Sequence, residues 1–327
     1  CKPLLSAEEA RDMNAVMPSE EQVVEWITSL SNWGRWGEED QAGCLNLITP
    51  EKRRQAAALI HDGTTVSCAR PITTEITPDI TYQVQRYMVD SGEGRDTDPP
   101  ERRRVRRGAA EFIGMVFHGQ TITHIDALSH YSWQGKMYNG KPASLVTSRE
   151  GAQSHAIDVA ADGIVSRGVL LDIPAVRGVP WLPADEPVMP DDLEAAERRA
   201  GVRVEAGDIL LVRTGNYRKI LEQGPVPGTV PMVACQVACT PWFKERDIAM
   251  LGTDTSNDAR PSAYPNIATP LHTVSLVGLG LWLIDNANLE QLAAACQQRQ
   301  RYTFMLCLGP LRLRRVTGSP VNPIALF

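Results

Sequence analysis

Runs of strand-forming residues outnumber the helical segments of this chain, and this ratio constrains the fold most. Several of the runs are rich in β-branched or aromatic residues and bounded by Gly, Pro or Asp, as strands commonly are. They cover 64–72, 114–126, 168–173, 208–214, 248–253, 274–284 and 302–313. Helices interrupt them irregularly, whereas a regular eight-fold α/β barrel needs a helix after every strand. The sequence therefore predicts a mixed α/β fold.

Helix signals mark four segments. The segment 19–30 opens with Ser19 and two glutamates before apolar residues at helical spacing. The segment 50–63 begins with Pro50 in its first turn and stops at Gly63, a pattern typical of a helix. The segments 190–200 and 289–298 have similar patterns. We therefore expect helices at these positions.

Charge and composition exclude several classes of protein. The net charge of −6 and the pI near 5.6 argue against nucleic acid as an electrostatic partner. The longest apolar run, 274–284, is about half the length that a membrane span needs. The acidic, polar start does not resemble a signal peptide, and seven scattered cysteines favour reduced thiols over a disulfide framework. Cys235 and Cys239 are expected to be packing residues. These features predict a cytoplasmic protein without a membrane span.

The segment 89–108 is polar and contains a Pro pair and five arginines between 102 and 107. It is predicted to be a long exposed loop, and loops of this kind often serve as lids or interface segments. The acidic residues just before the arginines supply internal partners for their charge, which disfavours nucleic-acid binding.

Three of the six histidines fall within the thirteen residues 118–130. If this stretch is extended, alternate side chains share a face, so His118, Gln120, His124 and Asp126 point the same way. Imidazole nitrogen and carboxylate oxygen together suit Zn²⁺, Mn²⁺ or Fe²⁺. His130 is placed to carry a proton beside the metal. The alternative is a set of polar residues satisfied within a strand, but so many histidines in one short stretch favour a site.

The neighbouring residues in the sequence indicate where two further histidines and four aromatic residues lie. His61 and His155 are expected at the surface. Four aromatic side chains are candidates for the wall of a mostly apolar substrate pocket, with core or interface packing as the alternative for each: Trp33, Trp36, Trp133 and Tyr138.

The segment 123–130 (THIDALSH) resembles the core of the His-x-Gly-Thr-His-x-Asp-x-Pro-x-His signature of the cyclase family. That family includes bacterial kynurenine formamidase, isatin hydrolase and trans-dienelactone hydrolase. A second block resembles the family's Gly-x-Asp-x-x-Ser, Pro-x-His and Glu-Asn-Leu elements, in 251–258, 270–272 and 284–289. The segment 207–215 is similar to the strand between the two blocks, and 32–43 and 137–140 suggest the longer-chain branch. The similarity runs in order from about residue 32 to 290.

The resemblance implies a single α/β domain over residues 1–327, with a β-barrel-like core and flanking helices, in a homodimer or homotetramer. Residues 1–31 would form an N-terminal helical extension of this domain. The resemblance also implies that His124 and Asp126 are metal ligands, with His272 as the distant ligand. His130 would be the general acid and base.

Two positions depart from the family pattern. The family's first ligand lies four residues before the central histidine, and this chain has Gln120 there. An amide oxygen binds metals more weakly than imidazole, and His118 could take over the role. Asp285 stands where the family tends to have Glu, and its shorter side chain leaves it outside the expected ligand set.

The sequence therefore predicts a hydrolase that uses a divalent metal ion, zinc or manganese, to open a cyclic amide or lactone or to cleave a small amide. Its expected partner is a small-molecule substrate. The alternative is a non-catalytic small-molecule-binding member of the fold with a degraded metal site, which Gln120 and Asp285 would favour. No Gly-x-Ser-x-Gly elbow indicates a serine hydrolase, and no glycine-rich loop indicates a nucleotide cofactor.

Overall fold

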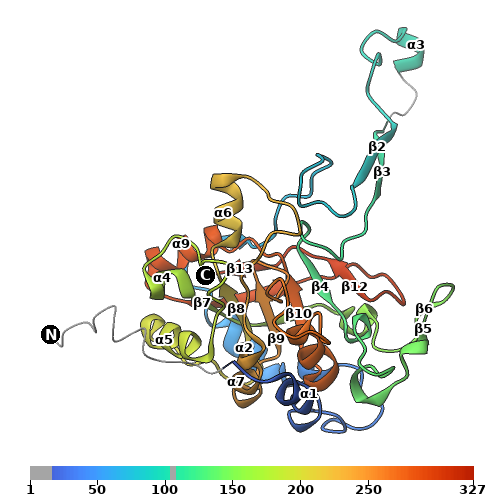
Figure 1. Cartoon of the computed structure of the whole chain (residues 1–327). Coiled ribbons are helices and arrows are strands. Elements are labelled where there is room, and N and C mark those ends of the chain that lie inside the picture. The colour runs from blue at the N-terminus through green and yellow to red at the C-terminus, as the bar shows by residue number, and fades with distance from the viewer. Residues whose placement is uncertain (1–16, 104–107) are drawn as a thin grey trace.

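A computed structural model describes residues 17–103 and 108–327. A nine-stranded sheet, curled into a half-barrel, forms the centre of the fold (Figure 1). Its strands, in spatial order, are β1 (Thr65–Ser67), β13 (Ile324–Leu326), β11 (Thr303–Leu308), β7 (Ile164–Asp172), β8 (Ile209–Arg213), β9 (Met250–Thr253), β10 (Trp282–Asp285), β4 (His124–Asp126) and β12 (Gly318–Pro320). Strands β7 to β10 are mutually parallel, and every other neighbouring pair in the sheet is antiparallel. The predicted mixed α/β fold with a barrel-like core is confirmed.

The central parallel strands are covered on both faces. Every residue of β8, β9 and β10 is buried, as expected of parallel strands with helices or loops over each side of the sheet. By contrast, β11 alternates buried and partly exposed residues. The apolar side chains of these strands form the main core.

The four predicted helices are present as α1 (Glu20–Ser29), α2 (Pro50–Ala57), α5 (Pro190–Ala200) and α9 (Glu290–Arg299). Ser19 caps α1 by accepting a hydrogen bond from the backbone N–H of Gln22. Gly201 ends α5 in the left-handed conformation, with φ of 63°. Helices α2 and α5 pack on β7, and α9 packs on β1 and β7.

Further helices were not predicted: α4 (Ile173–Arg177), α6 (Asn216–Gln223), α7 (Thr240–Arg246) and the short α8 (Pro270–His272). Short 3₁₀ turns are η1 (Gly43–Leu47), η2 (Leu128–His130), η3 (Tyr138–Gly140), η4 (Ala143–Leu145), η5 (Ile157–Ala160) and η6 (Val237–Cys239). A small hairpin pairs β5 (Val146–Thr147) with β6 (Gly151–Ala152).

Several strand predictions were wrong in part. The runs 64–72 and 302–313 are strands only over β1 and β11. The run 274–284 is mostly a π-helical segment, η7 (Thr273–Leu279), and only its end belongs to β10. Every residue of η7 is buried, so its uniform apolarity carries no period that separates helix from strand. The run 114–126 is not one strand, since only β4 at its end joins the main sheet.

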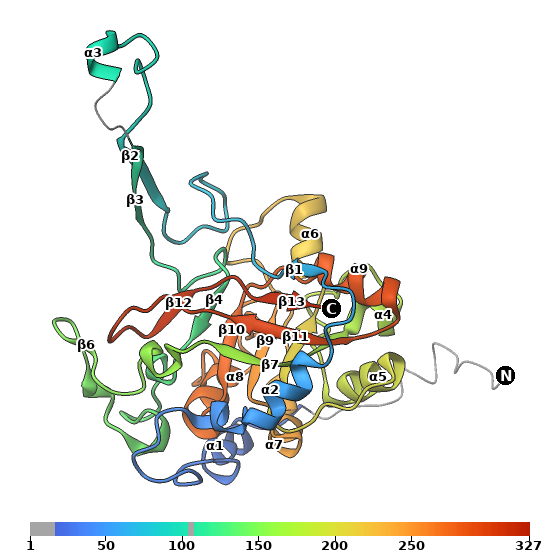
Figure 2. The ribbon, with the colours of Figure 1, turned by 180° about the vertical axis from the view of Figure 1, so that it is seen from behind.

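A hairpin arm projects from the body of the molecule (Figures 1 and 2). It consists of β2 (Gln85–Asp90) and β3 (Ala110–Gly114), which pair only with each other, and it carries α3 (Pro100–Arg103) near its tip. Residues 104–107 of the predicted loop, and residues 1–16 of the predicted N-terminal extension, lie outside the described part of the chain.

Cys235 and Cys239 are buried in the main core as unpaired thiols, as predicted. His61 is exposed, but His155 is fully buried, so its predicted surface position was wrong. Among the described residues, no helix is long and apolar enough to cross a membrane.

Candidate metal and catalytic site

Strand β4 brings two of the predicted ligands to one face. His124 and Asp126 are separated by one residue, so both side chains point the same way, and both are buried. The register of β4 with β10 sets His124 opposite Asp285. His124 Nε2 lies 3.5 Å from Asp126 Oδ1 and 3.8 Å from Asp285 Oδ2. Asp285, which was left out of the expected ligand set, therefore lies beside the central histidine.

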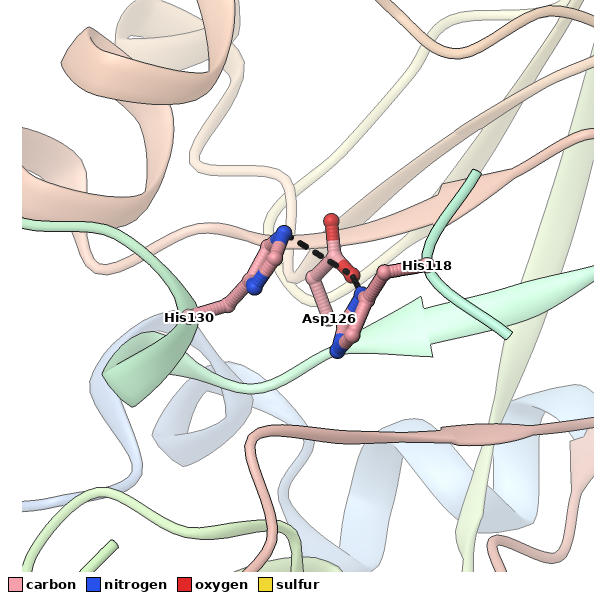
Figure 3. Close-up of side chains that lie close together, drawn as sticks. All are labelled: His118, Asp126 and His130. Carbon is pink, nitrogen blue, oxygen red and sulfur yellow. Dashed lines mark ion pairs between the residues drawn. The ribbon is translucent and has the colours of Figure 1, made fainter. Parts of the chain in front are cut away.

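His118, from the loop before β4, and His130, from the 3₁₀ turn η2 after it, approach the same carboxylate (Figure 3). Asp126 Oδ1 is 3.0 Å from His118 Nδ1 and 3.9 Å from His130 Nε2. The two imidazole rings are stacked, with centroids 3.8 Å apart. Gly318 makes room for His118, because a Cβ there would lie 2.9 Å from His118 Cε1 and 2.4 Å from the Ile125 carbonyl.

His272 reaches the cluster from α8, far along the chain. Its Nε2 lies 3.4 Å from Asp126 Oδ2 and 3.7 Å from Asp285 Oδ2. Asp258 fixes the ring by accepting from His272 Nδ1 at 2.6 Å and from the backbone N–H of His272 at 3.1 Å. This leaves Nε2 as the nitrogen that faces the cluster.

Outer contacts also orient His124 and Asp285. His124 Nδ1 lies 2.8 Å from the carbonyl oxygen of Ile122, which can only accept, so the Nε2 lone pair is left for the cluster. Asn257 Nδ2 donates to Asp285 Oδ1 at 2.5 Å, while Oδ2 faces the histidines. Histidine ligands in metal sites are commonly oriented in this way.

The Asp126 carboxylate shows that a cation fits here. Both of its oxygens are buried and neither accepts a hydrogen bond, although histidine nitrogens lie close by. His118 Nδ1 is likewise buried without a hydrogen bond. Buried polar groups are rarely left without a hydrogen-bond partner. The Asp126 oxygens and the histidine nitrogens around them converge without hydrogen-bond geometry, and such an arrangement suits a cation that all of them bind. Two groups of ligand atoms, each lying within 4.8 Å of one another, share this carboxylate: His118–Asp126–His130 and His124–Asp126–Asp285.

The electrostatics of the site follow from burial and from the close packing of opposite charges. Burial would raise the pKa of Asp126, but the surrounding histidines outweigh it and hold that pKa well below its ordinary value. Burial lowers the pKa of His130 to about 4, against the opposing pull of Asp126. For His272, burial is outweighed by Asp285, Asp126 and Asp258, which together raise its pKa well above the ordinary value.

The Gln120 side chain contacts the loop at Gly228. A Cβ built on Gly228 would lie 2.8 Å from Gln120 Nε2, so the amide rests against that loop. The Arg70 guanidinium donates to the Gln120 carbonyl, and Asn286 Nδ2 donates to the Gly119 carbonyl. Side-chain donors thus hold this stretch as a loop, which is why alternation along a strand fails here. A metal-binding role for Gln120 stays a prediction.

The four predicted pocket aromatics lie in other surroundings. Tyr138 is fully buried, and its ring lies edge-on to His155. Trp33 Nε1 donates to the Val277 carbonyl, Trp36 stacks on the Arg35 guanidinium, and Trp133 packs on the smaller core cluster. Substrate contacts for these four side chains stay predictions.

The aromatic rings that flank the histidines are Phe117 and Tyr131. The Tyr131 ring centroid lies 4.9 Å from those of both His130 and His272. The Phe117 ring lies 4.5 Å from that of His118. Each of these two aromatic residues is next to a cluster histidine in the sequence. That adjacency is the one sequence feature that could have predicted their position beside the site.

The comparisons with known proteins identify the family of this chain. The Cyclase family, described as "Putative cyclase", matches residues 55–258. A crystal structure described as that of a novel cyclase is 33% identical in sequence, with a TM-score of 0.83, and the match covers 91% of this chain and 100% of that one.

More distant solved structures share the fold. Isatin hydrolase A from Labrenzia aggregata, bound to benzyl benzoate, is 20% identical with a TM-score of 0.53, covering 83% of this chain and 94% of that one. Isatin hydrolase A from Ralstonia solanacearum is 19% identical with a TM-score of 0.55, covering 80% and 91%. Comparison with curated proteins gave no match. The family match over residues 55–258 and the 33% identity to a solved cyclase show that this chain belongs to the cyclase family.

Proposed function

We propose that this protein is a metal-dependent hydrolase that opens cyclic amides or lactones, or cleaves small amides. One observation carries the proposal: four histidines converge on the Asp126 carboxylate, whose buried oxygens accept no hydrogen bond. Such a donor set fits zinc or manganese.

Four side chains would hold the ion: His118, His124, Asp126 and His272. Asp285 lies within reach of the same point, beside His124 and His272. A divalent ion bound there supplies a water of lowered pKa and polarises a carbonyl group. Asp258 and Asn257 hold their partners in place and fix which atoms face the ion.

His130 would move the proton. Its lowered pKa, about 4, leaves the ring neutral near pH 7 and therefore able to accept a proton. Its side chain is 24% exposed, whereas that of His124 is 2% exposed, so His130 is the more accessible of the two to a substrate. After accepting a proton at Nε2, the imidazolium can return it to the leaving nitrogen or oxygen.

The non-catalytic alternative depended on Gln120 and Asp285. His118 lies 3.0 Å from the central carboxylate and Asp285 lies beside two histidines, so neither position still favours a degraded site. The isatin hydrolases that share this fold support cyclic amides as a substrate class to be tried first.

The test separates metal binding from turnover. His124→Ala and Asp126→Ala should lose metal and activity together, whereas His130→Ala should keep its metal and lose turnover. Metal content is measured by elemental analysis after reconstitution, and turnover with isatin, an N-formyl arylamine and an aryl lactone. His61→Ala, a change at an exposed histidine, is the matched control. A His124→Ala protein that retained full metal content would refute the assignment.

We further propose that the protein is a cytoplasmic homo-oligomer that acts on a small molecule and not on nucleic acid or membranes. The unpaired core thiols support a reducing compartment. The projecting arm supports assembly with a second copy, because an isolated two-stranded hairpin is marginally stable in water. Both strands of this arm carry exposed apolar side chains, and Tyr87 stacks on Phe112 across them.

A further inference from the structure

A cavity of about 550 Å³ borders Asp258, the residue that accepts a hydrogen bond from His272. Most of its lining is apolar and comes from separate loops, including Pro187, Val237 and Tyr264. Asp258 and Pro270 also line it. Because Asp258 binds His272 Nδ1, the cavity borders a residue that positions the proposed ligand. Its volume lies in the range of pockets for small organic ligands.

Arg260 lines the same cavity and has few partners for a charged group. Its Nη1 donates to the Gly228 carbonyl at 3.1 Å, and its Nη2 lies 3.2 Å from Met232 Sδ. Its Nε is buried and has no hydrogen-bond partner. Within the described part of the chain, no carboxylate oxygen lies within ion-pair distance of Arg260.

Two buried arginines of this chain, Arg213 and Arg246, pair with carboxylates. Arg213 pairs with Asp172 at 2.9 Å and with Glu290 at 2.7 Å. Arg246 pairs with Glu197 at 3.0 Å. A guanidinium has five donors in a planar fork that matches a carboxylate. Arg70, which is also buried, donates instead to the backbone carbonyls of Gln120 and Asp254.

The acidic groups near the cavity do not neutralise Arg260. Asp258 is engaged by His272 and by the backbone N–H of Leu271. Asp185 lines the cavity but is exposed to solvent. Asp285 attracts Arg260 electrostatically but forms no ion pair with it.

We propose that this cavity binds an organic acid, with its apolar body against the cavity wall and its carboxylate on Arg260. The inference rests on the proposed function and makes it more specific: the substrates are amides or lactones that carry a carboxylate on an apolar body. Arg260 then acts as a specificity-determining residue, since paired charges form shorter and stronger hydrogen bonds than neutral groups do.

The experiment compares a charged probe with its neutral isostere. The full chain is titrated calorimetrically with 2-naphthoate and with 2-naphthamide. Arg260→Met removes the charge at similar length and should weaken naphthoate binding about 10- to 100-fold, as expected for a lost charge-assisted hydrogen bond. Naphthamide binding should be unchanged. Arg149→Met is the matched control, because the Arg149 side chain is 92% exposed.

Two more variants locate the probe. Ala259→Phe narrows the cavity and should weaken both probes, whereas a probe held only by surface charge would not respond. Arg260→Lys keeps the charge without the planar fork and should lose part of the affinity. It also keeps the test valid if Arg260→Met folds poorly. Equal naphthoate affinity in wild type and Arg260→Met would overturn the proposal.

The His124→Ala variant distinguishes this failure from failure of the proposed function. If Arg260 holds the carboxylate, naphthoate still binds when the metal site is disrupted. If naphthoate binding falls in His124→Ala but not in Arg260→Met, the histidine–carboxylate cluster holds the acid. That result would overturn the present inference, while the proposed metal-dependent function would still stand. In steady-state kinetics, Arg260→Met should raise KM for carboxylated substrates while kcat stays near the wild-type value.

Discussion

Asp258 gives the sharpest test of how the site is held together, because it does not face the ion and yet fixes His272. Three donors converge on its carboxylate: the backbone N–H groups of Leu271 and His272, at 2.8 and 3.1 Å, and His272 Nδ1, at 2.6 Å. Asp258→Asn keeps the shape but replaces one acceptor oxygen with an NH₂ group. That group must face at least one of the three N–H donors.

Two effects follow from this substitution. Leaving a buried donor unpaired costs about 1–3 kcal/mol of folding stability. Loss of the carboxylate that orients His272 should weaken metal binding about 10- to 100-fold, as the loss of such outer partners usually does. That range corresponds to about 1.4–2.8 kcal/mol of binding free energy.

Asp254→Asn is the matched control. Asp254 lies four residues earlier, is fully buried, and accepts three hydrogen bonds from Thr214 and Gly215, yet it has no contact with the cluster. Both variants should lower the thermal unfolding midpoint, but only Asp258→Asn should weaken zinc binding in competition with a fluorescent chelator. Unchanged zinc affinity in Asp258→Asn, with the expected stability loss in both, would refute the positioning role.

Two further predictions concern other parts of the chain. Burial lowers the pKa of His155 to about 4, below its ordinary 6.5, so protonation favours the unfolded state. The contribution of neutral His155 to folding stability is complete above pH 6.5 and falls as the pH drops towards 4, by about 2 kcal/mol at pH 5. In urea unfolding, the free energy of unfolding of a His155→Gln chain should therefore depend less on pH than that of the wild type. An identical pH dependence in the two chains would contradict the assignment. For the arm, the double change Tyr87→Ser and Phe112→Ser should reduce the mass measured by light scattering, whereas Leu221→Ser, an exposed change on α6, should not. A wild-type chain that is monomeric at working concentration would count against assembly through the arm.

Local signals predicted the helices that carry their own start and stop residues. Pro190 at the first turn and Gly201 after the last turn delimit α5, and the structure places the helix between them. The η7 segment has no such contrast, because all of its residues are buried and most of them are apolar. Burial on all faces removes the period on which sequence interpretation depends.

The site was predictable in its residue types but only partly in its geometry. His124 and Asp126 lie on a strand, where alternation along the chain fixes the shared face. His118 reaches Asp126 for a different reason: the stretch before β4 is held as a loop by distant partners such as Arg70. Asp285 was set aside for the length of its side chain, but its approach to His124 follows from the register of β10 with β4, which no local pattern records.

The contrast between buried carboxylates explains why the cluster favours a cation over a structural role. Asp208 is fully buried and forms ion pairs with Lys52 at 2.5 Å and Arg167 at 2.6 Å. Asp254 is fully buried and accepts three hydrogen bonds. Asp126 is equally buried, but its oxygens meet only imidazole nitrogens that are not aligned to donate. Since this fold satisfies its other buried acids with protein donors, the unpaired carboxylate is best explained by a ligand that the protein chain does not supply. The convergence of four histidines on this carboxylate supports the proposal that the ligand is a metal ion.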